Sequence, residues 1–188
     1  MNLSETRAVI DAERYRNYVA AGGGKALPVA GAIYWIVLAI AGLYLNDRLW
    51  CLLAFATSGL IFPLGLLLQR PTHSSAMSKT AFGTLLFAAL FSMLCFWGVT
   101  IPLFYTARDF VPLSLGIGMS LHWPVIGWMY GRTLLFSLHT AIRTAAVIAL
   151  WYLSPDGRFT LIPLAIAGIY FLTALVIVFD VARLRAAR

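Results

Sequence analysis

The sequence contains few charged residues, and acidic ones are especially scarce. Asp, Glu, Lys and Arg make up 11% of the 188 residues, and only seven residues are acidic. A soluble domain carries about 25% charged residues, so this chain has too little charge to cover a soluble globule of its size. Because 61% of the residues are hydrophobic, most of the surface is expected to face lipid. These numbers argue against a soluble enzyme.

Cysteine is scarce too, and no leader sequence is visible. Cys51 and Cys95 both fall inside apolar runs and are not in a C-x-x-C spacing, so they are expected to pack as small apolar groups. The first 26 residues are polar, and the first apolar run is followed by a second one. This run is therefore predicted to be a retained membrane anchor rather than a cleaved signal peptide.

Apolar residues are gathered into runs that are long enough to cross a bilayer. A helix needs about 20 apolar residues for this, and the backbone of an isolated strand could not be satisfied in lipid. Six runs of about this length are present, at 27–45, 49–68, 81–105, 110–130, 133–153 and 160–179. The sequence therefore predicts an all-α polytopic membrane protein with six transmembrane helices in one domain, 27–180.

The N-terminal segment, 1–26, is predicted to hold a short amphipathic helix and a hinge. Ser4 is the expected N-cap. The helix could lie on the membrane surface, or it could stand in solvent. In the second case two ion pairs would support it: Arg7–Asp11 and Glu13–Arg16. Gly22–Gly24 is expected to end the helix and to act as a flexible hinge before the first span.

Basic residues are distributed unevenly between alternate loops of the six-span order. Ten of the 14 Lys and Arg residues lie on the side of the two termini, namely Arg7, Arg14, Arg16, Lys25, Arg70, Lys79, Arg132, Arg183, Arg185 and Arg188. Because basic loops stay in the cytoplasm, the protein is predicted to lie in a bacterial inner membrane with both termini cytoplasmic. Segment 181–188 would be a basic cytoplasmic tail. The net charge of +7 then faces anionic headgroups, so membrane lipids and not nucleic acid are the expected partners.

Two predicted spans that cross the membrane in the same direction each contain a proline that predicts a break in the helix. Pro63 in the second span and Pro124 in the fourth each remove the hydrogen bond to the carbonyl four residues earlier. These carbonyls belong to Gly59 and Ser120, and in a membrane each must find a partner inside the protein. Kinks are expected at both places, with Pro63, Pro124 and Gly59 as hinge residues. The shared spacing also suggests a repeated helical hairpin.

Arg143 is the most costly residue of the predicted membrane domain. It lies near the middle of the fifth run, where an arginine costs about 2.5 to 3.5 kcal/mol on insertion scales. None of the six apolar runs contains Asp or Glu. Arg143 is therefore expected to face the bundle, with a freed carbonyl, a hydroxyl, water or an anionic ligand as its partner.

Two histidines are expected to join Arg143 in a polar pocket. His139 precedes it by four residues and so lies on the same helix face, while His122 lies at a similar depth on the neighbouring fourth span. The histidines are expected to be neutral, because two adjacent cations disfavour one another. No metal is expected, since two histidines without a carboxylate or cysteine leave coordination incomplete, and no cofactor is expected. The candidate ligand-binding residues are Arg143, His139, His122, Ser120 and Thr140.

Several functions are compatible with this pocket. The preferred interpretation is binding or transport of a small anionic or amphiphilic solute between spans two, four and five, without enzymatic activity. An alternative is a lipid-acting enzyme in which His122 or His139 is the general base and Arg143 holds an anionic headgroup. A third is a non-catalytic scaffold or sensor that interacts through its N-terminal helix. The polar residues could equally be structural contacts between helices, and small residues on several spans would allow a homodimer.

Two resemblances to known families are carried by short motifs. Gly118-Met119-Ser120-Leu121 in the fourth span resembles the nucleophile motif of rhomboid intramembrane proteases. Those enzymes pair the serine with a histidine on the sixth span, where this sequence has none. The stretches GLIFPLG (59–65) and HWPVIGWMY (122–130) are similar to a family of small bacterial multi-span proteins of unassigned function. The second resemblance implies the multi-span topology and no catalytic residues.

Overall fold

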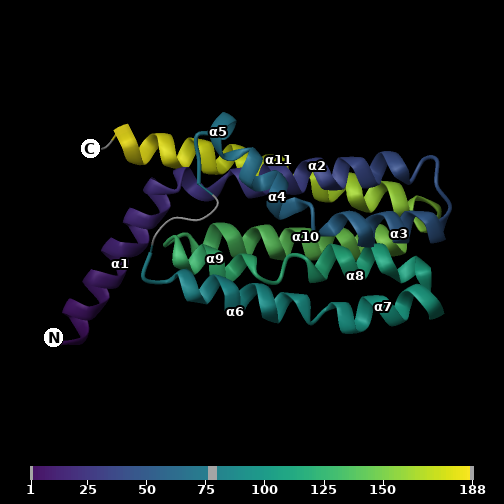
Figure 1. The fold of residues 1–188 in the computed structure, drawn as a ribbon, viewed down its shortest axis with the longest axis horizontal. Coiled ribbons are helices and arrows are strands. Elements are labelled where there is room, and N and C mark those ends of the chain that lie inside the picture. Colours follow the sequence, from purple (N-terminus) through teal and green to yellow (C-terminus); the bar gives the residue numbers. More distant parts are fainter. Residues whose placement is uncertain (1, 76–79, 187–188) are drawn as a thin grey trace.

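The computed structural model describes residues 2–75 and 80–186, and within them the regular structure is entirely helical (Figure 1). This confirms the predicted all-α class. The helices are α1 (Leu3–Ala20), α2 (Ala26–Ala41), α3 (Asp47–Ser58), α4 (Ile61–Leu67), α5 (Gln69–Thr72), α6 (Gly83–Leu94), α7 (Trp97–Thr106), α8 (Val111–Gly118), α9 (Trp123–Met129), α10 (Thr133–Leu153) and α11 (Arg158–Ala186). Short 3₁₀ turns lie at Gly22–Gly24, Arg108–Phe110 and Pro155–Gly157.

Five helical stretches of the described chain are long and apolar enough to cross a membrane, and the bent pair α3 and α4 makes a sixth if it is counted as one span. The five are Gly22–Ala41, Gly83–Thr106, Arg108–Met129, Thr133–Leu153 and Pro155–Ala186. Each of the six apolar runs falls on one of these stretches or on the bent pair. The last helix is longer than predicted, because α11 continues to Ala186 and includes most of the segment expected to be a tail.

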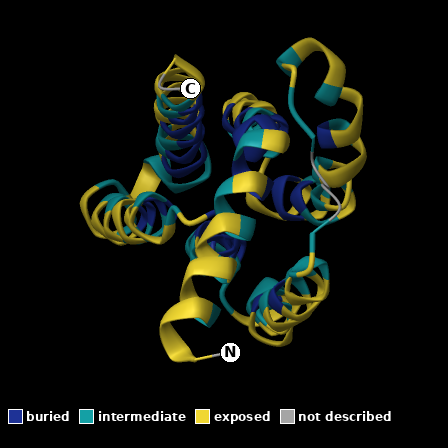
Figure 2. Cartoon of the chain, turned by 90° about the vertical axis from the view of Figure 1, so that its left-hand side faces the viewer, coloured by how far each residue is buried: buried dark blue, intermediate teal, exposed yellow. Residues whose placement is uncertain are grey.

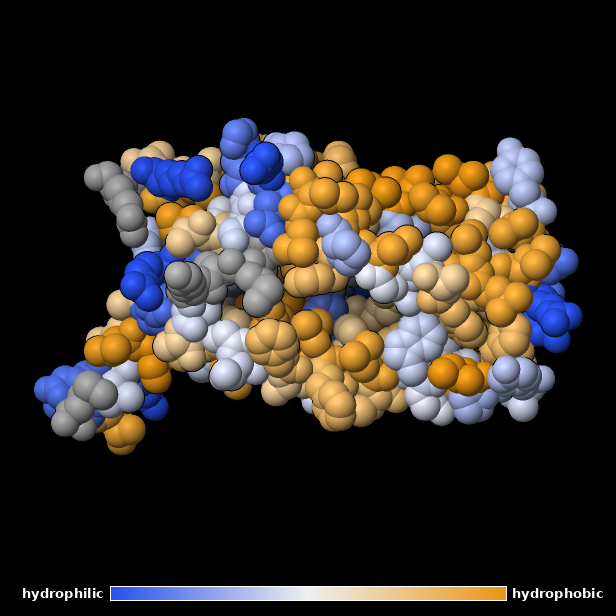
Figure 3. Space-filling model, in the orientation of Figure 1, coloured by the Kyte–Doolittle hydropathy of each residue, from blue (hydrophilic) through white to orange (hydrophobic). Residues whose placement is uncertain are grey.

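The long helices lie side by side along one axis, with α2 packed along α11 and α10 in contact with α8, α9 and α11 (Figure 1). Buried residues face the inside of this bundle, as Figure 2 shows. The stretch Gly83–Thr106 is outermost, since 11% of its apolar window is buried against 61% for Gly22–Ala41. Hydrophobic side chains cover most of the face seen in Figure 3, and hydrophilic ones gather towards its two ends.

Helix α1 begins at an N-cap different from the expected one. The side chain of Asn2 accepts a hydrogen bond from the backbone N–H of Glu5 at 2.9 Å, and the Glu5 carboxylate accepts one from the Asn2 N–H at 2.9 Å. The two form a capping box. Ser4 lies inside the first turn and donates to the Asn2 side chain. The prediction of Ser4 as the N-cap is therefore wrong by two residues.

Of the two ion pairs expected on α1, one forms and the other is replaced. Glu13 and Arg16 form the expected pair. Asp11 pairs with Arg14 at 2.8 Å instead of with Arg7. In both observed pairs the acid precedes the base along the helix, which is the orientation that the helix dipole favours.

The three glycines after α1 form a packed turn, not a flexible hinge. Gly22, Gly23 and Gly24 are buried, and all three have positive φ, between 57° and 75°. A Cβ atom added to Gly23 would lie 2.3 Å from Cγ2 of Ile177 on α11. The prediction of a flexible linker is corrected by this contact, because neighbours that are remote in sequence enclose the turn.

The candidate spans that contain Pro63 and Pro124 are broken where the sequence predicted kinks. Helices α3 and α4 meet at a 50° bend after Ser58, with Pro63 in the first turn of α4. In the fourth span α8 ends at Gly118 and α9 begins at Trp123, with Pro124 as its second residue. Motion of these breaks as hinges stays a prediction. A further break, between α6 and α7, carries no proline and was not anticipated.

Candidate ligand-binding site between two broken helices

A cavity of about 180 Å³ lies between the two breaks. The first break contributes Ser58 and Gly59, and the second contributes Met119 and His122. Helix α6 forms a further wall, and Tyr170 of α11 reaches the cavity from the other side of the bundle. The breaks therefore do more than bend two helices, since together they leave space in the interior.

Arg143 is the central residue of α10 and is completely buried, with 0% of its surface exposed. Its Nη1 donates to the hydroxyl of Tyr170 at 2.8 Å. The guanidinium carbon lies 5.1 Å from the ring centre of Trp35 and 5.2 Å from that of Tyr170. A hydroxyl was one of the four kinds of partner expected for Arg143. Its Nε and Nη2 have no hydrogen-bond partner within residues 2–75 and 80–186.

The carboxylates that form ion pairs in the described chain are all paired with other arginines. The pairs are Asp11–Arg14, Glu13–Arg16, Asp47–Arg108, Asp109–Arg158 and Asp180–Arg132. All of them lie on α1 or near the ends of the bundle. Arg143 has no carboxylate partner in the part of the chain that the structure describes, so the positive charge inside the bundle is not neutralised there.

Tyr170 connects this buried charge to the cavity. Its hydroxyl accepts hydrogen bonds from Arg143 and, at 3.3 Å, from Nε1 of Trp123. Its side chain lines the cavity, whereas that of Arg143 does not. Arg143 therefore stands behind the cavity wall. Tyr170 is not among the predicted site residues, although it is a lone tyrosine in the middle of the last apolar run.

His139 lies beside Tyr170 and away from the cavity wall. It is 3% exposed, and its ring centre is 4.8 Å from that of Tyr170. Its Nδ1 lies 2.8 Å from the hydroxyl of Thr173, and this hydroxyl donates to the carbonyl of Ile169 at 2.8 Å. Because the threonine proton is engaged there, Nδ1 of His139 is the donor of this bond. Its Nε2 is a buried atom without a partner among the described residues.

His122 is the histidine that reaches the cavity. It immediately precedes α9 and lines the cavity wall, with its ring centre 5.1 Å from that of Trp123. Its buried Nδ1 has no hydrogen-bond partner in the described part of the chain. Trp123 also contacts His139, at 5.3 Å between ring centres. The structure thus groups His122, His139 and Arg143 around Trp123 and Tyr170.

Ser120 and Thr140 lie outside this group and do not line the cavity. The hydroxyl of Ser120 donates to the carbonyl of Ile117 at 2.7 Å. The carbonyl of Ser120, which Pro124 frees, accepts a hydrogen bond from the Thr140 hydroxyl at 3.1 Å. The second bond joins the fourth span to α10, and in the first the serine hydroxyl of the rhomboid-like motif is engaged by the backbone of its own span. Neither residue offers its hydroxyl to a ligand in this arrangement.

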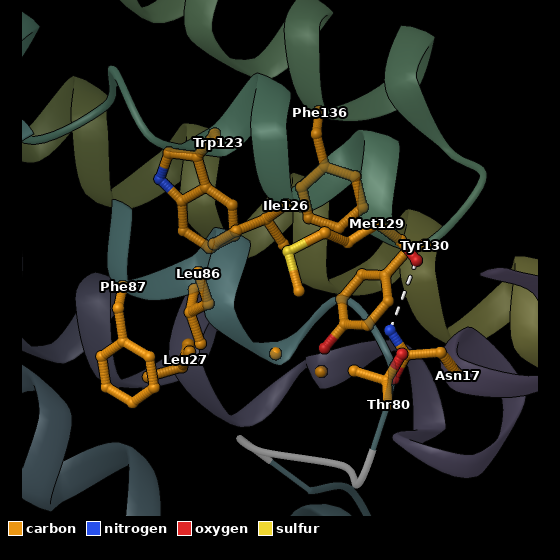
Figure 4. A pocket seen from close by; sticks show the side chains of 12 residues that line it. Asn17, Leu27, Thr80, Leu86, Phe87, Trp123, Ile126, Met129, Tyr130 and Phe136 are labelled. Carbon is orange, nitrogen blue, oxygen red and sulfur yellow. Dashed lines mark hydrogen bonds between the residues drawn. The ribbon is translucent and has the colours of Figure 1, made fainter. Parts of the chain in front are cut away.

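A second, smaller cavity of about 80 Å³ adjoins the first and extends towards the end of the bundle that carries α1 and the C-terminus, here called the terminal end. The two cavities share four wall residues, Leu27, Leu86, Trp123 and Ile126. Figure 4 shows aromatic and aliphatic side chains around the smaller cavity, with Asn17 and Thr80 close together at one margin. The side chain of Asn17 donates to the carbonyl of Met129 at 3.3 Å.

The fold and this interior space define a class of protein: an all-helical chain with five or six helices that could cross a membrane. Residues 10–180 match the model of a family described as a family of unknown function, DUF7010. The chain belongs to this family. No curated protein and no solved structure matches it.

Proposed function

We propose that this protein is a bacterial inner-membrane protein, with both termini cytoplasmic, that binds or transports a small anionic or amphiphilic solute in the cavity between its broken helices. The observation that carries the proposal is the complete burial of Arg143 without a carboxylate partner in the described chain, one side chain behind the cavity wall. An anionic group at the wall would compensate this charge.

The interior of the bundle has a low dielectric constant, so electrostatic effects there are strong. An isolated buried charge is costly unless it is paired and hydrogen-bonded. Two aromatic faces, each contributing about 0.5 to 2 kcal/mol, and one hydroxyl from Tyr170 offset part of this cost. The remaining positive potential is weakly screened inside the bundle, so it favours an anion in the adjoining cavity.

The position of the cavity supports a transport role. Membrane transporters often place their substrate sites at the bilayer midplane, where discontinuous helices meet. Here α3–α4 and α8–α9 are both interrupted, and both interruptions line one cavity. A cavity of about 150 Å³ holds a benzene molecule, so the 180 Å³ cavity has room for a small solute or for the head of a larger one.

Ligand-induced stabilisation of the protein in lipid nanodiscs tests the proposal, with butyrate and octanoate as anionic probes and 1-octanol as the neutral control. The carboxylates are expected to raise the unfolding temperature of the native protein and of Arg143→Lys. They are expected not to stabilise Arg143→Leu, because an anion-dependent gain needs the charge. Equal stabilisation of Arg143→Leu and native protein would contradict the proposal.

A specific observation also favours a second candidate, the lipid-acting enzyme. His122 lines the cavity, and its buried Nδ1 has no partner among the described residues, so this imidazole is the candidate general base. The His122→Ala variant separates the two functions. An enzyme would lose turnover of a lipid substrate while it still binds octanoate, and a binding protein would show no turnover in either form.

A further inference from the structure

The two adjoining cavities have apolar walls that reach the outside of the bundle. The walls include Phe62 of α4 and Phe87 of α6, which are 42% and 63% exposed. Helix α4 packs on α2, while α6 packs on α9. Figure 3 shows this face of the molecule hollowed between the side chains over α4 and those over α6. In a membrane this hollow would open towards lipid.

At the terminal end of the cavities, α1 is hydrogen-bonded to residues 80–81, which precede α6. The hydroxyl of Thr80 and the N–H of Ala81 donate to the carboxylate of Glu13 at 3.1 and 3.3 Å. The hydrogen bond from Arg16 holds the pKa of Glu13 below its ordinary value, so Glu13 is ionised at neutral pH and keeps these bonds. These bonds join α1 to residues 80–81 beside the smaller cavity, whose wall includes Asn17 and Thr80.

The polar side chains in the wall of the larger cavity are those of Ser58, His122 and Tyr170. Tyr170 is 4% exposed, and the positive charge of Arg143 stands behind it. Phe62 of α4, in the same wall, is 42% exposed and so lies closer to lipid than Tyr170 does. A molecule that matches this polarity has an anionic head inside and an apolar body that points towards lipid.

We infer that the occupant is a single-chain anionic amphiphile that enters from the bilayer through the gap between α4 and α6. This inference rests on the proposed function and adds the class of solute and its route. Charge complementarity places the head near Tyr170, and the apolar walls accommodate the chain. The cavities, about 180 and 80 Å³, are too small for a lipid with two acyl chains.

The experiment uses the full-length protein in nanodiscs and decanoic acid that carries a photoreactive diazirine near the end of its chain. Cross-linked residues are identified by mass spectrometry, with decanoate, butyrate and 1-decanol as competitors. We expect saturable labelling of the α4 and α6 walls that decanoate suppresses at least tenfold more effectively than butyrate or 1-decanol. Labelling confined to lipid-facing positions outside this gap would overturn the inference.

Three variants of α6 test the route. Leu90→Trp fills the gap, whereas Leu94→Trp adds the same bulk one helical turn further on, at a residue that is 49% exposed and does not line the cavity. Labelling is expected to fall at least tenfold in Leu90→Trp and to stay within twofold of the native level in Leu94→Trp. Leu90→Ala widens the gap and is expected to label at least as fast as the native protein, which controls for misfolding of the larger replacement.

The outcomes distinguish this inference from the proposed function. If butyrate competes as well as decanoate, Leu90→Trp labels normally and Arg143→Leu still abolishes binding, the solute is a small anion from water. The lateral route is then wrong while the anion site stands. If no labelling is saturable and Arg143→Leu changes nothing, both proposals are wrong.

Discussion

Arginines at the ends of the bundle and the arginine at its centre are held in different ways. Arg132 pairs with Asp180 at 2.6 Å, and its guanidinium lies 5.0 Å from the ring centre of Tyr18. Arg143 has the hydroxyl of Tyr170 and two aromatic faces, without a carboxylate partner in the described residues. The charge of Arg132 is therefore neutralised by a carboxylate, whereas the charge of Arg143 is not neutralised by any described residue.

The surroundings of the two arginines make this difference energetically important. The side chains of Arg132 and Asp180 are each 27% exposed, so water screens their attraction, and such pairs contribute about 0 to 1 kcal/mol. Arg143 is fully buried, where desolvation is costly and electrostatic effects are large. Arg143 is therefore expected to be the costlier of the two arginines to hold in place, with two aromatic rings and one hydroxyl to offset that cost.

The largest effect is expected for Arg143→Leu, and it is the loss of the response to octanoate. Replacing a buried charge by an apolar residue of similar size is often neutral or stabilising, by about 1 to 4 kcal/mol. We expect this variant to unfold at the same or higher denaturant concentration than the native protein, while it loses the response to octanoate. A loss of more than 2 kcal/mol would show that Arg143 mainly stabilises the fold, and the comparison with Arg132 would fail.

Tyr170→Phe is expected to have the next largest effect. It removes the hydroxyl that accepts from Arg143, and hydrogen bonds to charged groups contribute about 1.5 to 3 kcal/mol. Tyr34→Phe is the matched control, because the Tyr34 hydroxyl is also buried but donates to the neutral carbonyl of Ala54 at 2.9 Å. Its loss should cost about 1 kcal/mol. Equal losses in denaturant unfolding would mean that the Arg143 bond carries no extra charge-dependent energy.

The smallest effect is expected at the terminal end. Arg132→Leu should lower the free energy of unfolding by about 1 kcal/mol, and the difference from the native protein should shrink as salt is raised. Octanoate should still stabilise this variant. The comparison would be sharpened if Asp180→Asn gave the same small loss, and it would be broken if either change removed the response to octanoate.

Much of the fold could be predicted because its signals are local. The apolar runs predict the spans within a few residues, and Pro63 and Pro124 predict where two of them break, since a missing N–H acts on the same helix. The turn at Gly22–Gly24 could not be predicted as packed, because the residues that enclose it, such as Ile177, are remote in sequence. The break between α6 and α7 carries no proline signal.

The candidate site was predicted only in part. Arg143 and His139 share a helix face by spacing, and the structure buries both. The carbonyl of Ser120, four residues before Pro124, was expected to need a partner, and it accepts from the Trp123 N–H and from the Thr140 hydroxyl. The sequence left the partner of Arg143 undecided between a carbonyl, a hydroxyl, water and an anionic ligand, and it did not point to Tyr170. Its position opposite Arg143 depends on the rotation of α11 against α10, which no local pattern reports.

The order of amino acids by itself determines the helical class and the apolar runs that could cross a membrane. It also places an arginine inside one run and no acidic residue in any of the six. Composition and periodicity establish these because they act within one helix and its solvent. Tertiary packing decided that Tyr170 meets Arg143, that the two breaks enclose one cavity, and that Ser120 and Thr140 bond each other. These contacts join residues of different helices, and they depend on how side chains from all of the helices fill the shared interior.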